Sequence, residues 1–158
     1  QFTSLTPESV VNETMELALI QAEKLNARIN TTIEPNLPAM NGDSVMLEQL
    51  LLNLLKNAME AVQPCPNHTI DLDVRLHESG SFIQFKVADH GTGIPDDAKT
   101  MLFDAFYSTK DEGMGMGLNI CRSIVEVHHG RIVISDTPGG GATFTFTVPV
   151  AREHPDLM

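Results

Sequence analysis

One row of side chains that could do chemistry is a set of amides, Gln49, Asn53 and Asn57, spaced by four residues. Residues four apart share one face of an α-helix, so the three amides would project together. Amide oxygens are suitable ligands for a hard cation, and amide NH₂ groups can donate hydrogen bonds to phosphate. Solvated amides on a helix surface would give the same spacing, so the row alone leaves both interpretations open.

A second group, residues 89–94, follows an alternating apolar stretch and begins with Asp89. A carboxylate at the end of a strand can accept a hydrogen bond from an exocyclic amine. Gly91 and Gly93 would let the backbone approach a flat ring closely. Asp and Gly also dominate ordinary turns, so a plain turn is the alternative.

The third group is Gly113, Gly115 and Gly117, which directly precede a segment with helical periodicity. Glycines there expose N–H groups at the positive end of a helix, a combination typical of phosphate binding. The spacing matches neither the dinucleotide fingerprint nor the P-loop. A flexible linker is the alternative, although a linker would not be expected to run straight into a helix. Lys110, just before these glycines, could neutralise phosphate charge.

The elements that must position these residues follow from apolar periodicity and capping residues. The expected elements are a helix over residues 4–26 capped by Thr6, a strand over 28–34, a loop over 35–42, a helix over 43–62, strands over 69–76 and 82–88, a helix over 116–129 stopped by Gly130, and strands over 131–136 and 142–148. This order predicts an α+β fold, a two-layer α/β sandwich with one mixed, mostly antiparallel sheet and helices on one face. We expect one domain over residues 1–150 and a disordered tail over 151–158.

Composition restricts the partners of the chain. Its 158 residues carry 10 Lys+Arg against 21 Asp+Glu, a formal net charge of −11. This charge argues against nucleic acid and against direct contact with an anionic membrane. An acidic chain can still bind a nucleotide through backbone N–H groups, a metal ion and a few placed lysines.

The two cysteines, Cys65 and Cys121, lack metal-type spacing, and no apolar stretch approaches the length of a membrane span. Two inert thiols in a reducing, cytoplasmic compartment are expected, with a disulfide as the minor alternative.

In this order and spacing, the motifs resemble the Bergerat ATP-binding fold shared by DNA gyrase B, the ninety-kilodalton heat-shock chaperone, MutL and sensor histidine kinases. The similarity to the bacterial histidine kinases covers about residues 5–150. The segments that carry it are residues 50–58 (N box), 89–93 (G1 box), 102–106 (F box), 113–118 (G2 box) and the closing glycine-rich segment 139–144.

The resemblance implies that the chain binds ATP and Mg²⁺ and assigns roles to residues. Asn57 would ligate Mg²⁺, and Asp89 would accept from the adenine amine. Asn53 and Lys110 would be the catalytic residues, with Lys110 reaching the γ-phosphate from a lid over residues 104–114. Thr143 would support the adenine pocket. The full set implied to bind the cofactor is Asn53, Lys56, Asn57, Asp89, Gly91, Gly93, Ile94, Lys110, Gly113, Gly115, Met116, Gly117, Leu118 and Thr143.

Asn53 also bears on the reaction type. The hydrolysing relatives carry Glu at this position as a general base, and an amide cannot take a proton. Transfer to a histidine on another domain is therefore favoured, since phosphoryl transfer depends mainly on positioning and charge stabilisation. The alternatives are a hydrolysing ATPase, a serine-directed anti-sigma kinase, and a module that binds nucleotide without transfer.

The sequence departs from the family pattern at His90, Met114, Met116 and the pair Glu60-Ala61. The last change leaves one phosphate-contacting role unassigned. A phosphoacceptor motif is absent, since none of the six histidines has the expected neighbours, and His128 and His129 suit a helix cap. The resemblance thus implies a monomeric catalytic domain that acts on the dimerisation and phosphoacceptor domain of the same protein, with a response regulator downstream.

Overall fold

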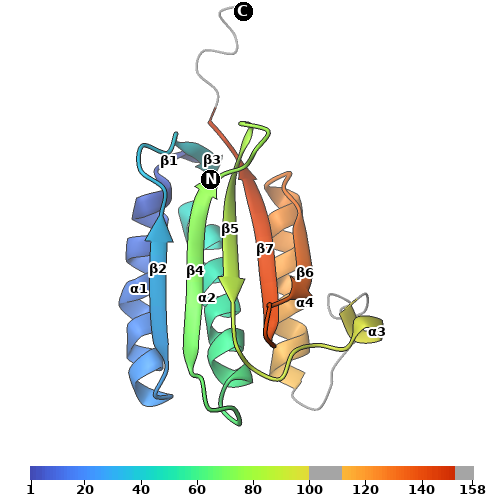
Figure 1. Ribbon diagram of the computed structural model, residues 1–158. Coiled ribbons are helices and arrows are strands. Elements are labelled where there is room, and N and C mark those ends of the chain that lie inside the picture. The colour runs from blue at the N-terminus through green and yellow to red at the C-terminus, as the bar shows by residue number, and fades with distance from the viewer. Residues whose placement is uncertain (100–111, 152–158) are drawn as a thin grey trace, which may run out of the picture.

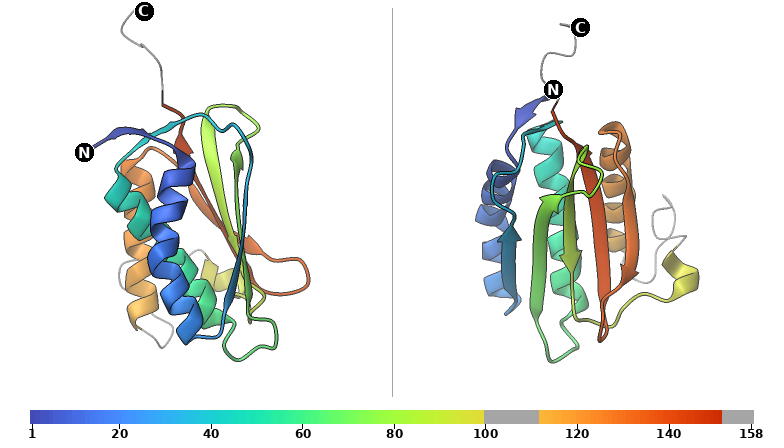
Figure 2. Two further views of the ribbon diagram at one scale, coloured as in Figure 1. Left: turned by 90° about the vertical axis from the view of Figure 1, so that its left-hand side faces the viewer. Right: turned by 45° about the horizontal axis from the view of Figure 1, so that its top comes forward.

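The computed structural model describes residues 1–99 and 112–151, and only the backbone of residues 112–117. A five-stranded sheet is covered on one face by three helices, α1 (Pro7–Lys24), α2 (Ser44–Ala61) and α4 (Glu112–Val127), as Figures 1 and 2 show. The predicted two-layer α/β sandwich is therefore confirmed. Within the described ranges, we find no helix long and apolar enough to cross a membrane.

The sheet has the strand order β2-β4-β5-β7-β6. Its strands are β2 (Arg28–Ile33), β4 (Thr69–Leu76), β5 (Phe82–Ala88), β6 (Ile132–Asp136) and β7 (Ala142–Pro149). Only the β2–β4 pair is parallel, so the sheet is mixed and mostly antiparallel. At its centre the rings of Phe85 and Phe146 stack with centroids 4.7 Å apart.

The two long N-terminal helices begin where their caps predict. The Thr6 hydroxyl accepts from Ser9 N at 3.2 Å at the start of α1, and Asp43 Oδ1 accepts from Met46 N at 3.0 Å at the start of α2. The apolar stripe of α2 is fully buried against the sheet and the other helices, through Leu50, Leu51, Leu54 and Leu55.

Three short features were not predicted. Strands β1 (Thr3–Leu5) and β3 (Met40–Gly42) pair antiparallel, where the sequence suggested the start of a helix and a loop. Helix α3 (Asp96–Lys99) follows Pro95. Ala151 N donates to Ala39 O at 2.8 Å, so Ala151 is not part of a disordered tail, and residues 152–158 lie outside the described residues.

Helix α4 differs from its prediction at both ends. It begins at Glu112, four residues before the predicted start at Met116. It ends in a Schellman arrangement, in which Gly130 N donates to Val125 O and His129 N to Glu126 O, both at 3.0 Å. His129, with φ of 63°, holds the left-handed position, so the expectation that Gly130 stops the helix is wrong. Gly130 is needed instead because a Cβ there would overlap the carbonyl oxygen of Thr147.

Replacing Gly130 with Ala is expected to lower the free energy of unfolding by about 1–3 kcal/mol, the usual cost of overpacking. His129→Gly is the matched control and should raise it by a few tenths to about 1 kcal/mol, because glycine adopts positive φ without strain. Urea denaturation of both variants measures the difference, and equal stabilities would contradict the backbone assignment.

His128 joins the end of α4 to the start of α2. Its Nδ1 donates to Ile124 O at 2.8 Å, and its Nε2 accepts from Asp43 N at 3.1 Å. The ring is buried and also stacks on Phe2 with centroids 4.5 Å apart. A donor on one nitrogen and an acceptor on the other require the neutral ring with its proton on Nδ1.

Candidate functional site

Asp89 directly follows β5, whose C-terminal end lies at the lower edge of the sheet in Figure 1. Its side chain is buried, at 2% exposure for the residue. Oδ1 accepts from Gly91 N at 2.9 Å and from Ala142 N at 3.1 Å. Burial raises the pKa of Asp89, opposed by these two amides and by His90. The backbone therefore fixes one carboxylate oxygen and leaves Oδ2 out of both bonds.

Two glycines allow the backbone to close around Asp89. A Cβ on Gly91 would lie 2.5 Å from the carbonyl oxygen of Ala61 at the end of α2. A Cβ on Gly141 would overlap the Asp89 carbonyl, and Gly141 has φ of 121°. Gly93, with φ of 80°, lies close to Gly141, since a Cβ added to Gly93 would stand 3.5 Å from the carbonyl oxygen of Gly141. The segment after β5 is thus held between α2 and the glycine turn before β7.

Asn57 is the amide that α2 brings to this region. It lies four residues before Ala61, on the same helix face, and Gly91 lies against Ala61. The residue is 9% exposed, and its buried Nδ2 has no hydrogen-bond partner within the described part of the chain. A buried donor without a partner costs about 1–3 kcal/mol, so it indicates a site for a ligand.

Asn53 lies one turn before Asn57, half-buried beside the thiol of Cys121 on α4. Burial raises the pKa of Cys121 to about 12. The hydrogen bond between Cys121 and Asn53 acts in the opposite direction but is the smaller effect. Cys121 is thus an inert thiol, and both cysteines are free, as expected. Lys56 is half-buried on the same helix.

The start of α4 reaches the same end of the molecule. Two hydrogen bonds relate α2 to α4: one joins Asp43 to His128, and the other joins Leu50 to Cys121. Moving seven residues forward along α2 therefore means moving seven residues back along α4. The helices are therefore antiparallel, and seven further residues bring Asn57 level with the first turns of α4 (Figure 1). The N–H groups of the first three helical residues, here 112–114, have no partner within the helix.

These first turns include Gly113 and Gly115. Met116 and Gly117 lie deeper in the helix than expected, because α4 begins earlier than predicted. The side chain of Leu118 is fully buried in the core. Ile94 is half-buried and packs on the core.

Thr143 lies opposite Ala88 in the β5–β7 pairing, next to Asp89. Its hydroxyl lies 2.9 Å from that of Thr137, and both residues are buried. Thr137 also closes the glycine turn, since its N donates to Gly141 O at 3.0 Å and its O accepts from Gly140 N at 2.9 Å. Sequence reasoning missed Thr137; the only signal was a threonine on each side of three glycines.

Replacing Thr137 with Val is expected to weaken ATP binding by about 1 kcal/mol, because the Thr143 hydroxyl loses a buried partner. Thr137→Ser retains the hydroxyl and should bind as the parent chain does. Calorimetric titration with ATP measures both, and equal affinity of the Val variant would separate Thr137 from the site.

Lys110, the F box at residues 102–106 and the lid up to residue 111 lie outside the described residues.

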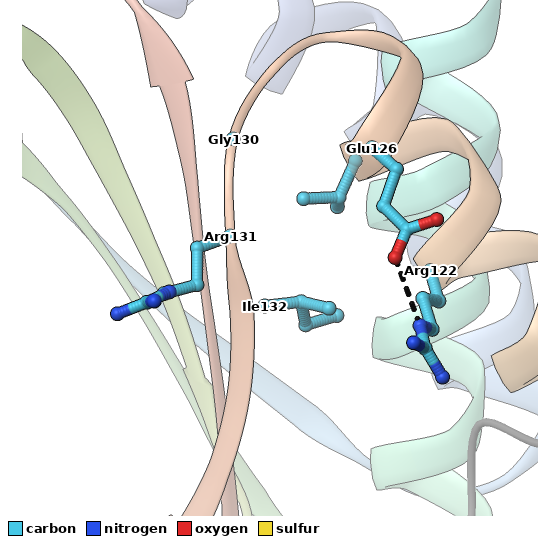
Figure 3. Close-up of a pocket in the computed structure, with 6 residues that line it drawn as sticks. Arg122, Glu126, Gly130, Arg131 and Ile132 are labelled. Carbon is cyan, nitrogen blue, oxygen red and sulfur yellow. Dashed lines mark hydrogen bonds and ion pairs between the residues drawn. The ribbon is translucent and has the colours of Figure 1, made fainter.

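A pocket of about 300 Å³ lies elsewhere, between α4 and β6 (Figure 3). Its lining includes Arg122 and Glu126, whose Nε and Oε2 atoms form an ion pair at 3.0 Å. Ile132 points across toward α4, whereas Arg131 points away from the pocket. Because these residues lie toward the end of α4, this pocket is not the site of Asp89 and Asn57.

Comparison with known proteins agrees with this geometry. The pattern of the family described as histidine kinase-, DNA gyrase B- and HSP90-like ATPases matches residues 42–152. The chain belongs to this family. The expected resemblance to the catalytic domains of histidine kinases is also confirmed by the individual relatives.

Among the relatives, the chain is 42% identical over 153 residues to the C4-dicarboxylate transport sensor protein DctS of Rhodobacter capsulatus, covering 97% of this chain and 23% of DctS. The crystallised catalytic domain of the histidine kinase ThkA is 27% identical, with a TM-score of 0.83 over 95% of this chain and 96% of ThkA's. Full-length ShkA in complex with AMPPNP has the same identity and TM-score, over 97% of this chain and 32% of ShkA. The chain thus spans less than a third of DctS and ShkA.

Proposed function

We propose that this domain binds Mg-ATP at the end of the sheet formed by Asp89, α2 and the start of α4. It then transfers the γ-phosphoryl group to a histidine on a separate phosphoacceptor domain of the same protein, in two-component signalling. The observation that carries the proposal is the convergence of two buried side chains. One is the backbone-held carboxylate of Asp89, and the other is the amide of Asn57, whose Nδ2 has no partner among the described residues.

The residues suit an adenine ring at Asp89. Oδ1 is occupied by two backbone amides, so Oδ2 remains to accept from an exocyclic amine. Gly93 has a left-handed backbone and no Cβ, which lets a flat ring approach the backbone there. Gly91 and Gly141 contribute indirectly, because they let the backbone close around Asp89. A guanine would present a carbonyl oxygen to this carboxylate, so adenine is favoured.

Residues for Mg²⁺ also fit. The Asn57 side chain offers an oxygen, the ligand type that Mg²⁺ prefers, and Mg²⁺ is commonly held by one or two protein ligands together with substrate phosphates. Within residues 1–99 and 118–151, no group of three His, Cys, Asp or Glu side chains could hold a metal ion. When bound, the ion would neutralise phosphate charge.

The role of Asn53 follows from its chemistry. It lies one turn from Asn57 and beside a thiol whose pKa is raised, so neither group serves as a base for water. Asn53 would orient the phosphates, and the N–H groups of the first turn of α4 would bind their oxygens. Lys110 would complete the charge neutralisation.

Transfer in trans tests the proposal. The 158-residue chain, incubated with γ-labelled ATP, Mg²⁺ and a separate histidine phosphoacceptor domain, should label that domain slowly with an acid-labile phosphate. An acceptor whose histidine is replaced by Ala is the control and should stay unlabelled. Strong labelling of the chain itself, or phosphate release without labelled acceptor, would refute transfer to a separate histidine.

We further propose that the domain is monomeric alone and that a response regulator receives the phosphoryl group from the acceptor histidine. Sedimentation of the chain over a concentration series tests the first statement, and a shift to a dimer would contradict it.

A further inference from the structure

The helix face that points away from the sheet carries exposed apolar side chains. Leu17 on α1 is 57% exposed and Ile20 is 52% exposed. Both share a helix face with Glu13, because positions spaced by four and seven residues lie together. Leu52 on α2 is only partly buried against the core. These side chains form an apolar strip along the two helices.

Helices α1 and α2 run side by side in the same direction, as Figure 1 shows. Near their starts, the side chains of Glu13 on α1 and Glu48 on α2 lie close enough to interact. Beyond their ends, Gln63 Nε2 donates to Leu25 O at 2.9 Å. Leu17 follows Glu13 by four residues, and Leu52 follows Glu48 by four residues. The two leucines therefore lie about one helical turn beyond the two glutamates on neighbouring helices.

One end of this strip is acidic. Glu13 and Glu16 come from α1 and Glu48 from α2, and burial followed by the contact with Glu13 raises the pKa of Glu48 to about 7. Nearby Asp43 and Glu16 act in the same direction. Glu13 and Glu16 are exposed and Glu48 is half-buried, so cations of another molecule can reach this group of carboxyl side chains.

We propose that this α1–α2 face, formed by Glu13, Glu16, Leu17, Ile20, Glu48 and Leu52, docks a basic amphipathic helix of a separate partner protein. The partner's apolar stripe covers the strip of Leu17, Ile20 and Leu52, and its Lys or Arg residues meet the three glutamates. Glu13 to Lys24 spans about 16 Å along α1, which suits a partner helix of about three turns.

A second copy of this chain fits the face less well than a basic helix. The face has three glutamates, and the lysines that share its helix rows are Lys24 on α1 and Lys56 on α2. A second copy would therefore bring more carboxylates than cations to the interface. The face lies on the outer side of the helix layer and does not depend on the proposed nucleotide site.

The test uses a synthetic helical peptide of about 18 residues, with leucines along one stripe and lysines beside them. Titration into the ¹⁵N-labelled chain should shift resonances of α1 and α2. The variant Leu17→Ser/Ile20→Ser should weaken binding at least about tenfold. The matched control is Leu19→Ser, which is 54% exposed on the same helix but rotated away from the face, and it should bind as the parent does.

Peptide controls separate charge from apolar contact. Serine in place of the leucines, or glutamate in place of the lysines, should each abolish binding. Shifts outside α1 and α2, equal weakening by Leu19→Ser, or full binding of the serine peptide would overturn the proposal. So would a dimer of the parent chain that the double variant dissolves. The variants should bind ATP with the same affinity as the parent chain. ATP titrations therefore distinguish a loss of peptide docking from a loss of nucleotide binding.

Discussion

Replacing Asn57 with Ala is expected to abolish the magnesium-dependent tightening of ATP binding and to reduce phosphoryl transfer to background. The Asn57 side chain offers an oxygen to a metal at this site, and its Nδ2 has no hydrogen-bond partner among the residues that the structure describes. ATP titrations with and without Mg²⁺, together with labelling of the acceptor domain, measure both effects.

The same variant should leave folding almost unchanged. Removing a buried donor that has no partner relieves its desolvation cost, which offsets the lost packing, so the free energy of unfolding should change by less than about 1 kcal/mol. Gln49→Ala, an exposed amide two turns earlier on α2, is the matched control and should keep the magnesium effect. A magnesium effect that persists in Asn57→Ala would place the metal elsewhere.

Replacing Asp89 with Asn is expected to weaken ATP binding by about 1–3 kcal/mol, or about 5- to 150-fold, the usual cost of an unsatisfied buried polar contact. Asparagine would keep one oxygen for the amides of Gly91 and Ala142, and its NH₂ would then face the adenine amine, donor against donor. Calorimetry measures the loss, and thermal unfolding checks that the variant is folded.

A ligand that lacks the exocyclic amine makes the Asp89 test specific. The parent chain should bind purine riboside triphosphate more weakly than ATP, by about the same factor as the substitution. Asp89→Asn should bind the two nucleotides alike, because the coupled pair is already broken. If the variant still prefers ATP by the full factor, the adenine amine is recognised by another group.

The elements that were predicted closely are those specified by local patterns. Strands β4 and β5 have the predicted bounds, because alternation of apolar and polar residues shows directly which face is buried. The cap at Asp43 and the leucines of α2 predicted that helix to within one residue at each end.

The errors arose where distant segments decide the local structure. Strands β1 and β3 have three residues each, and their paired residues Ser4 and Asn41 are 37 positions apart in the chain. Three residues are too few to show an alternation of apolar and polar side chains, so neither strand was recognisable from its own sequence. Gly130 looked like a helix stop, but the carbonyl of Thr147 on β7 is what excludes a side chain there. The glycines of residues 113–117 disfavour a helix by propensity, although the backbone is helical from Glu112.

The sequence by itself determined which residues could bind a nucleotide, since Asn57, Asp89 and the glycines are recognisable by type, spacing and family resemblance. Only the tertiary structure decided how they are used. It directs one oxygen of Asp89 to an amide 53 residues away, leaves Nδ2 of Asn57 buried without a partner, and pairs Thr137 with Thr143. These contacts depend on strand register and helix packing, which join residues that no local pattern connects.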